Sequence, residues 1–170
     1  MGNNWKITDT LTKVFADEVP DGQGSIRLST LHRETVSCVI AYFGAADWGR
    51  YWKVSVKAPE KIETRLRRVE LVPSAYPCHK EQDDNYLRIV PGMYPDLLRD
   101  LDTEDDGADK KYLTKEVPGQ WRSLWLDVTV DAELAGGDYA IVIETETEDG
   151  EKETLKADLH VGDASLTPQK

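Results

Sequence analysis

Residues 36–43 read Val-Ser-Cys-Val-Ile-Ala-Tyr-Phe, and this stretch decides the fold class. The residues at 36, 38, 40 and 42 are apolar, and most of those between them are apolar too. A period of two indicates a β-strand, and apolar residues on both sides indicate that both faces of the strand are buried. We therefore predict a central strand in the interior of a sheet.

Other segments show the simpler pattern of one apolar and one polar face, which is typical of half-buried strands. They are residues 52–57, 123–130, 139–143 and 155–161. Turn sequences at 136–138 and 148–150 separate the last three, and their Gly-Gly and Asp-Gly pairs are typical of hairpins. Shorter candidates lie at 13–15, 25–28, 63–71 and 86–90. With about nine strands, the chain is predicted to be all-β, a two-sheet antiparallel β-sandwich.

Helical periodicity is nearly absent. The best candidate is residues 95–102, where Pro95 precedes three leucines at helical spacing, so we expect at most one short helix. It falls within a long loop excursion from Val72 to Gly119, in which we predict a single strand. Excursions of this length are usually functional or disordered.

The 170 residues carry a formal charge of −11 at pH 7, and the sequence pI is about 4.7. Because such a chain repels phosphate backbones and anionic lipids, nucleic acid and membranes are excluded as partners. The length predicts one domain. No apolar run reaches the roughly 18 residues of a membrane span, and no signal peptide is recognisable, so we expect a cytoplasmic protein. Cys38 and Cys78 are predicted to be free thiols.

The acidic stretch 100–109 contains the nearest approach to a metal-binding motif. Asp102, Glu104 and Asp106 precede a glycine with the alternating spacing of a calcium loop. Leu113, however, stands where such a loop needs a bidentate glutamate, so we expect a solvated acidic loop without a metal or any other cofactor. The sequence also lacks nucleophile-elbow and His/Cys metal spacings, and we do not expect this chain to be an enzyme.

Aromatic residues are the remaining candidates for a functional site. Trp48, Tyr51 and Trp52 form an aromatic cluster, and Trp121 and Trp125 share one face of a later strand. Such side chains pack in cores and interfaces more often than they bind ligands, but exposed rings also stack on sugars. Both interpretations stay open at this point.

Several short motifs, taken in order, resemble one family. Residues 5–20, which open with Trp-Lys-Ile, and residues 28–34 look like the start of the N-terminal β-sandwich domain of glycoside hydrolase family 123-like proteins. This group is also described as domain-of-unknown-function family 4091. Tyr-Pro-Asp at 94–96, Trp-Arg-Ser-Leu-Trp at 121–125 and Gly-Gly-Asp-Tyr at 136–139 are similar to later segments of that domain. Residues 161–168 look like the connector that follows it.

In that family an Asp-Glu pair hydrolyses N-acetylhexosaminides with assistance from the substrate, and the pair lies in a (β/α) barrel after the connector. The resemblance implies that residues 1–162 are a non-catalytic accessory β-sandwich and that residues 163–170 are the connector. It further implies that the partner is a downstream barrel of the same polypeptide, missing from this chain. The full-length protein would then be an N-acetylhexosaminidase-like glycoside hydrolase.

The resemblance leaves the role of the aromatic residues to be assigned. For the face that packs on the barrel, we choose residues 94–98, which begin with Tyr94, Pro95 and Asp96, together with the aromatic cluster. An apolar patch should then be exposed there. The alternative function is a carbohydrate-binding module in which Trp121, Trp125 or the aromatic cluster stacks on sugar rings.

Overall fold

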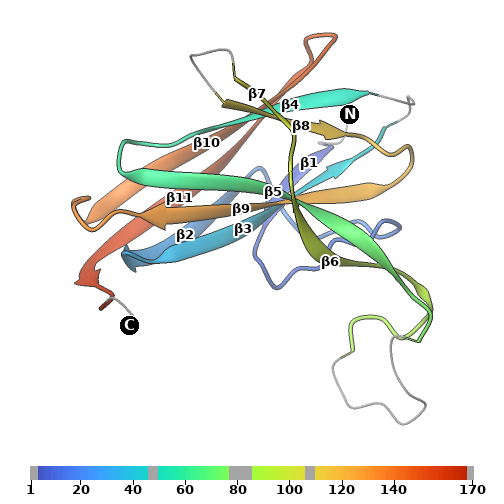
Figure 1. Ribbon diagram of the computed structural model, residues 1–170, viewed down its shortest axis with the longest axis horizontal. Helices are drawn as coiled ribbons and strands as arrows, with labels where there is room; N and C mark the ends of the chain where they lie inside the picture. Colours follow the sequence, from blue (N-terminus) through green and yellow to red (C-terminus); the bar gives the residue numbers. More distant parts are fainter. Residues whose placement is uncertain (1–3, 46–49, 77–85, 106–109, 168–170) are drawn as a thin grey trace.

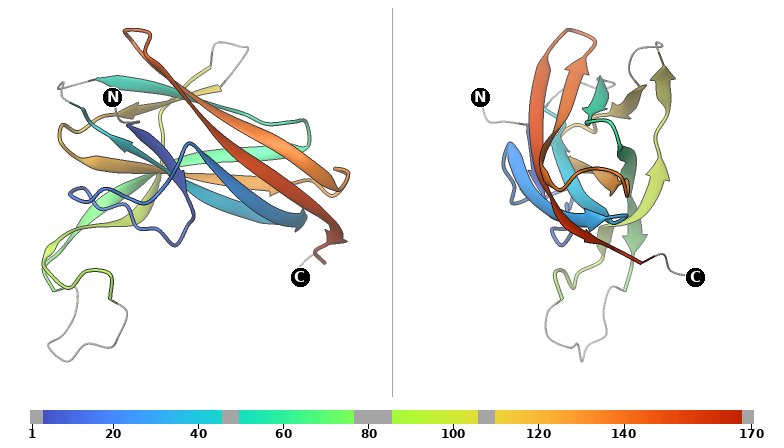
Figure 2. Two further views of the ribbon diagram at one scale, coloured as in Figure 1. Left: turned by 180° about the vertical axis from the view of Figure 1, so that it is seen from behind. Right: turned by 90° about the vertical axis from the view of Figure 1, so that its left-hand side faces the viewer.

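The structure is a computed structural model that describes residues 4–45, 50–76, 86–105 and 110–167. These residues form eleven β-strands and no helix, in one sheet of five strands and one of six (Figures 1 and 2). The five-stranded sheet has the order β1-β3-β9-β5-β6, with β1 Trp5–Thr8, β3 Thr35–Phe43, β9 Trp121–Val130, β5 Ile62–Ser74 and β6 Gly92–Asp100. The six-stranded sheet has the order β2-β11-β10-β4-β8-β7, with β2 Ser25–His32, β11 Lys152–Ser165, β10 Gly137–Thr147, β4 Tyr51–Lys57, β8 Lys110–Lys115 and β7 Thr103–Asp105. The predicted two-sheet β-sandwich is confirmed.

Strand pairing is antiparallel between the described strands, except that β2 lies parallel to β11. The predicted hairpin between β10 and β11 is present, and Gly150 occupies the left-handed region at φ 82° in its turn. None of the described residues belongs to a helix long and apolar enough to cross a membrane.

The central strand β3 lies between β1 and β9, as an interior strand should. Residues 38–42 are buried without a break because both faces of this strand are covered. Cys38 and Ile40 join the main core between the sheets. On the outer face, Val39 packs with Val14 and Trp121 in a second apolar cluster. The loop that carries Val14 thus covers one end of the five-stranded sheet from outside.

The long excursion is more regular than the sequence pattern indicated, because it contains strands β6, β7 and β8. The predicted helix over 95–102 is wrong, since residues 92–100 form the edge strand β6. A bulge explains the misleading pattern. Leu71 pairs with Pro95 and Glu70 pairs with Leu97, so one residue of β6 is left over and the alternation of β6 breaks there. An edge strand also tolerates proline.

Two other strand predictions are wrong. Residues 13–15 form an irregular loop that buries Val14 and Phe15. Residues 86–90 are also irregular and extend beyond the sheets beside the ends of β5 and β6 (Figure 1). Apolar side chains in such loops imitate a strand pattern without pairing to any neighbour, whether they are buried, as in 13–15, or exposed, as in 86–90.

The two cysteines differ in their surroundings. Cys38 is fully buried and unpaired, and burial, with a smaller contribution from the charge of Asp127, raises the pKa of its thiol to about 12. Cys78 lies outside the described residues. The thiol of Cys38 is therefore part of the core and is not a reactive group at neutral pH.

Candidate functional site

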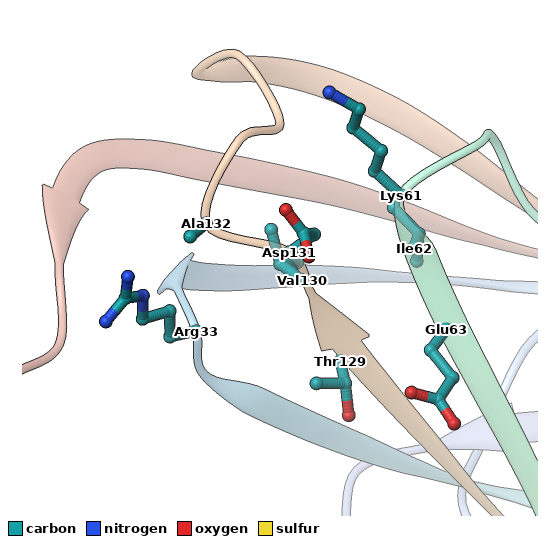
Figure 3. Close-up of a pocket in the computed structure, with 8 residues that line it drawn as sticks. All are labelled: Arg33, Lys61, Ile62, Glu63, Thr129, Val130, Asp131 and Ala132. Atoms are coloured by element: carbon teal, nitrogen blue, oxygen red, sulfur yellow. The ribbon is translucent and has the colours of Figure 1, made fainter. Parts of the chain in front are cut away.

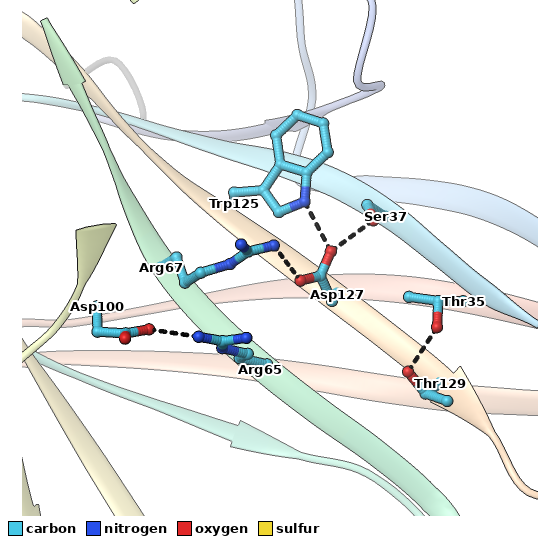
Figure 4. A network of polar contacts seen from close by, with 8 residues as sticks. All are labelled: Thr35, Ser37, Arg65, Arg67, Asp100, Trp125, Asp127 and Thr129. Atoms are coloured by element: carbon cyan, nitrogen blue, oxygen red, sulfur yellow. Dashed lines mark hydrogen bonds and ion pairs between the residues drawn. The ribbon is translucent and has the colours of Figure 1, made fainter. Parts of the chain in front are cut away.

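The outer face of the five-stranded sheet carries a polar network centred on Asp127 (Figure 4). One oxygen of its carboxylate, Oδ1, accepts hydrogen bonds from Ser37 Oγ and Trp125 Nε1, each at 2.7 Å. The other, Oδ2, accepts one from the Arg67 guanidinium at 2.5 Å. The donors come from β3, β9 and β5, which the register places side by side. Asp127 therefore fixes the position of the Trp125 indole.

The electrostatics of the network favour an ionised Asp127. Partial burial alone would raise the pKa of this carboxyl group, but the hydrogen bonds from Ser37, Trp125 and Arg67 and the charge of Arg67 outweigh it. The net result is a pKa below the ordinary value of 3.8. The ion pair is protected from water, since the side chains of Arg67 and Asp127 are only 22% and 17% exposed.

A groove of about 220 Å³ opens next to Trp125. One wall comes from the loop of residues 10–14, including Thr12 and Lys13, and the other comes from the edge strand β6. Val39, Val69 and Ser123 line it from the sheet. The groove therefore brings together segments that are more than 80 residues apart in the sequence, and its lining is partly aliphatic and partly polar.

The groove collects several of the residues that the sequence singled out. Trp125, Pro95 and Asp96 all line it. Tyr94 lies on the neighbouring part of β6, where its ring packs edge-on against Phe15 at a centroid distance of 5.7 Å. No sequence pattern indicates that Trp125 and residues 95–96 lie close together, because their proximity depends on the strand order β9-β5-β6.

The aromatic cluster lies elsewhere. Trp48 is outside the described residues, and β4 carries Tyr51 and Trp52 in the other sheet. Trp52 is buried in the main core and donates a hydrogen bond from its indole to Glu116 Oε1 at 2.6 Å. Tyr51 is 43% exposed, with the Lys115 ammonium 5.1 Å from its ring centroid. The structure thus does not place Tyr51 and Trp52 on one face with residues 94–98.

Trp121 belongs to the second apolar cluster rather than to an open surface. It is 7% exposed and its ring lies 5.4 Å from that of Phe43. Lys6 places its ammonium 5.4 Å from the indole centroid. Of the two tryptophans on the outer face of β9, Trp125 is the one that reaches the groove.

The described residues of the acidic stretch 100–109 do not converge on a metal site. Glu104 pairs with Lys53 across β8, at 2.8 Å between the ammonium and the carboxylate. Asp102 is exposed, and Asp106 lies outside the described residues. Within the described ranges, no three His, Cys, Asp or Glu side chains come together in a way that could hold a metal ion.

The outer face of the six-stranded sheet is different in character, because exposed ion pairs cover it. Examples are Lys57 with Glu144 at 2.7 Å and Lys156 with Asp158 at 2.6 Å. Exposed pairs of this kind contribute at most about 1 kcal/mol each and keep a surface hydrated.

A larger hollow of about 630 Å³ lies at one end of the sandwich (Figure 3). Arg33, Lys61 and Asp131 line it from three different turns. Arg33 and Lys61 adopt left-handed conformations, at φ 64° and 69°. Backbone hydrogen bonds tie these turns to one another: Arg33 N–H donates to the Val130 carbonyl, and Asp131 N–H donates to the Lys61 carbonyl. Turn geometry accounts for these conformations.

Residues 87–97 expose several large apolar side chains. We call this set the apolar edge, and it consists of Leu87, Ile89, Val90, Met93 and Leu97, which are between 44% and 72% exposed. Arg88 anchors this segment, because its guanidinium bonds Asp17 and Glu18 and lies 3.9 Å from the centroid of Phe15. The hydrogen bond from Arg88 also lowers the pKa of Asp17.

Comparison with known proteins gives information on the fold alone. No protein-family profile matches the chain, and no curated protein sequence is significantly similar to it. Among solved structures, a family 123 glycoside hydrolase from Clostridium perfringens, studied for glycolipid glycan hydrolysis, superposes with a TM-score of 0.65 at 9% identity. The match covers 95% of this chain and 27% of that chain, so this chain spans about a quarter of the enzyme's length.

Weaker matches involve bacterial surface proteins. The collagen-binding subdomain of the Enterococcus faecalis surface protein ACE has a TM-score of 0.46 at 5% identity and covers 80% of this chain and 93% of its own. The major pilin SpaD of Corynebacterium diphtheriae has a TM-score of 0.45 at 10% identity, covering 90% of this chain and 33% of its own. We draw no conclusion from these two.

Proposed function

We propose that this chain is a non-catalytic accessory domain of a larger, glycoside-hydrolase-like polypeptide related to family 123. The main observation in support is that nearly the whole chain superposes on about a quarter of a family 123 enzyme. A domain of that size leaves most of the enzyme for a separate catalytic unit. The sequence resemblance to the N-terminal sandwich of the same family, described above, supports the assignment independently. In this proposal residues 163–170 connect the sandwich to a downstream (β/α) barrel.

The apolar edge is our candidate for the surface that packs on this barrel. Its large side chains gather within residues 87–97, although monomeric proteins seldom expose apolar residues in such density. The remaining outer surfaces suit this role less well, because the six-stranded sheet is covered with hydrated ion pairs. Of residues 94–98, this choice keeps Leu97 in the interface, whereas Pro95, Asp96 and Leu98 line the groove. It leaves out Trp52, which is committed to the core.

The position of the connector sets a geometric requirement. β11 ends at Ser165 beside the β2–β3 turn, at the end of the sandwich opposite to residues 86–91 (Figures 1 and 2). The 14 residues of β11 span about 45 Å at the usual rise of a strand. A barrel that contacts the apolar edge must therefore lie along the long axis of the sandwich.

Two experiments test the proposal. The isolated chain, assayed on aryl N-acetylhexosaminides, should show no turnover, and measurable turnover that survives rigorous purification would contradict a non-catalytic role. In the full-length polypeptide, the double substitution Leu87→Ser and Val90→Ser should weaken the interface and lower the stability of the assembled protein. The matched control is Leu11→Ser, which changes a side chain that is 86% exposed on another loop. Equal effects of the two changes would remove the apolar edge from the interface.

A further inference from the structure

We propose that the groove beside Trp125 binds a single neutral pyranose ring of a carbohydrate. This inference goes beyond the accessory role, because it assigns a ligand to a surface that the proposed barrel interface does not need. It rests on the shape of the groove, on the chemistry of its lining and on the way in which Trp125 is held.

The size of the groove restricts the ligand. About 220 Å³ is the space of roughly seven water molecules, which suits one hexose ring and lies below the usual range for larger ligands. A disaccharide would have to extend into solvent. We therefore expect the groove to recognise one residue, either alone or as part of a longer glycan.

The lining matches the two kinds of surface that a pyranose presents. Trp125, Val69 and Leu98 offer an indole and aliphatic groups to the C–H face of a sugar ring. Lys13 and Asp96 provide an ammonium and a carboxylate for its hydroxyl groups. One cation and one anion leave these polar groups without net charge, which favours a neutral sugar over a uronic acid or a phosphorylated one.

Trp125 is held in place before any ligand arrives. Its indole N–H donates to Asp127, which Ser37 and Arg67 hold from two neighbouring strands. A ring fixed in this way loses little conformational freedom on binding, so more of the stacking energy contributes to affinity. In this proposal, the hydrogen-bond network in Figure 4 orients Trp125 for ligand binding in addition to stabilising the sheet.

Nuclear magnetic resonance on the ¹⁵N-labelled chain tests the proposal. The probes are the methyl glycosides of β-glucopyranose, β-galactopyranose, α-mannopyranose and β-N-acetylglucosamine, each titrated to about 20 mM because single sugar rings bind weakly. At least one should cause saturable shifts in the amides of residues 10–14, 96–98 and 123–125. Trp125→Ala should weaken this binding about tenfold, and Trp125→Phe, which keeps a ring for stacking but loses the indole N–H that Asp127 holds, should give an intermediate affinity.

Two further variants keep the test independent of folding. Lys13→Ala and Asp96→Ala change groove residues outside the core, and each should weaken binding severalfold if Trp125→Ala fails to fold. Tyr51→Ala, which removes an exposed ring from the other sheet, should leave the affinity unchanged. The proposal is overturned if no probe causes saturable shifts, if the shifts map to another surface, or if Tyr51→Ala weakens binding as much as the groove variants.

Discussion

The hydrogen bond between Trp52 and Glu116 offers the sharpest test of the packing described above. The indole donates to Oε1 of a glutamate that is 3% exposed, and the other oxygen of that carboxyl group, Oε2, is buried with no hydrogen-bond partner in the described part of the chain. Trp52 also packs edge-on against Trp5 at 5.2 Å. Trp52→Phe keeps an aromatic ring in the core but removes the donor and some volume.

The cost follows from these contacts. Removing the donor leaves a buried carboxyl oxygen without its hydrogen bond, which costs about 1–3 kcal/mol, and the smaller ring adds a cavity term of about 1–2 kcal/mol. We expect Trp52→Phe to lower the free energy of unfolding by about 2–5 kcal/mol, or the melting temperature by about 10 °C. Glu116→Leu should also destabilise the protein, because it leaves the indole N–H without its acceptor.

A double-mutant cycle separates the hydrogen bond from the cavity. The free energies of unfolding of the parent, both single variants and the double variant are measured by urea denaturation, followed by circular dichroism. The double variant should lose about 2 kcal/mol less unfolding free energy than the two single variants lose together, because neither partner of the hydrogen bond is left unpaired in it. Additivity within about 0.5 kcal/mol would refute the claim that this hydrogen bond contributes to stability.

Three further predictions concern other parts of the sandwich. Asp127→Asn should destabilise the protein by about 1–2 kcal/mol at pH 7. Because the pKa of Asp127 is lowered in the folded state, the difference in stability from the parent should shrink as the pH falls below 3.8. A difference in urea stability that does not change with pH would contradict this. In a Cys78→Ser background, Cys38 should resist a thiol reagent at pH 8 until urea unfolds the chain, whereas rapid labelling of the native protein would place the thiol at the surface. Gly44→Ala should lower the free energy of unfolding by about 2 kcal/mol or more, because an added Cβ would lie 2.2 Å from the Val117 carbonyl oxygen. The control is Gly92→Ala, whose added Cβ meets nothing within 4 Å, and its melting temperature should stay near that of the parent.

The sheets could be predicted where alternation is long and uninterrupted. The pattern from 36 to 43 identified β3 and its burial on both faces, and the hairpin of β10 and β11 followed from its turn residues. The strand β8 escaped notice because a threonine, Thr114, occupies one of its buried positions. β6 was mistaken for a helix because three leucines follow Pro95 at helical spacing, and the bulge interrupts the alternation that would have indicated a strand.

The candidate site was only partly predictable. The sequence singled out Trp125, Pro95 and Asp96 separately, but their meeting in one groove depends on strand order and on a loop of residues 10–14 that no motif marks. It also suggested Trp52 as a surface residue, because a run of nearby aromatics carries no information on which ring the second sheet will cover. Long-range packing determines which residues line the groove and which ring is buried, and this packing cannot be predicted from composition.

The central claim is that this sandwich packs, through its apolar edge, on a further domain of the same polypeptide. Hydrogen exchange, compared between the isolated chain and the full-length product of its gene, tests it most directly. We predict slower exchange in the full-length protein for the amides of residues 86–97, with little change on the outer face of the six-stranded sheet. Unchanged exchange at residues 86–97, or protection confined to the hollow around Arg33 and Lys61, would contradict the account.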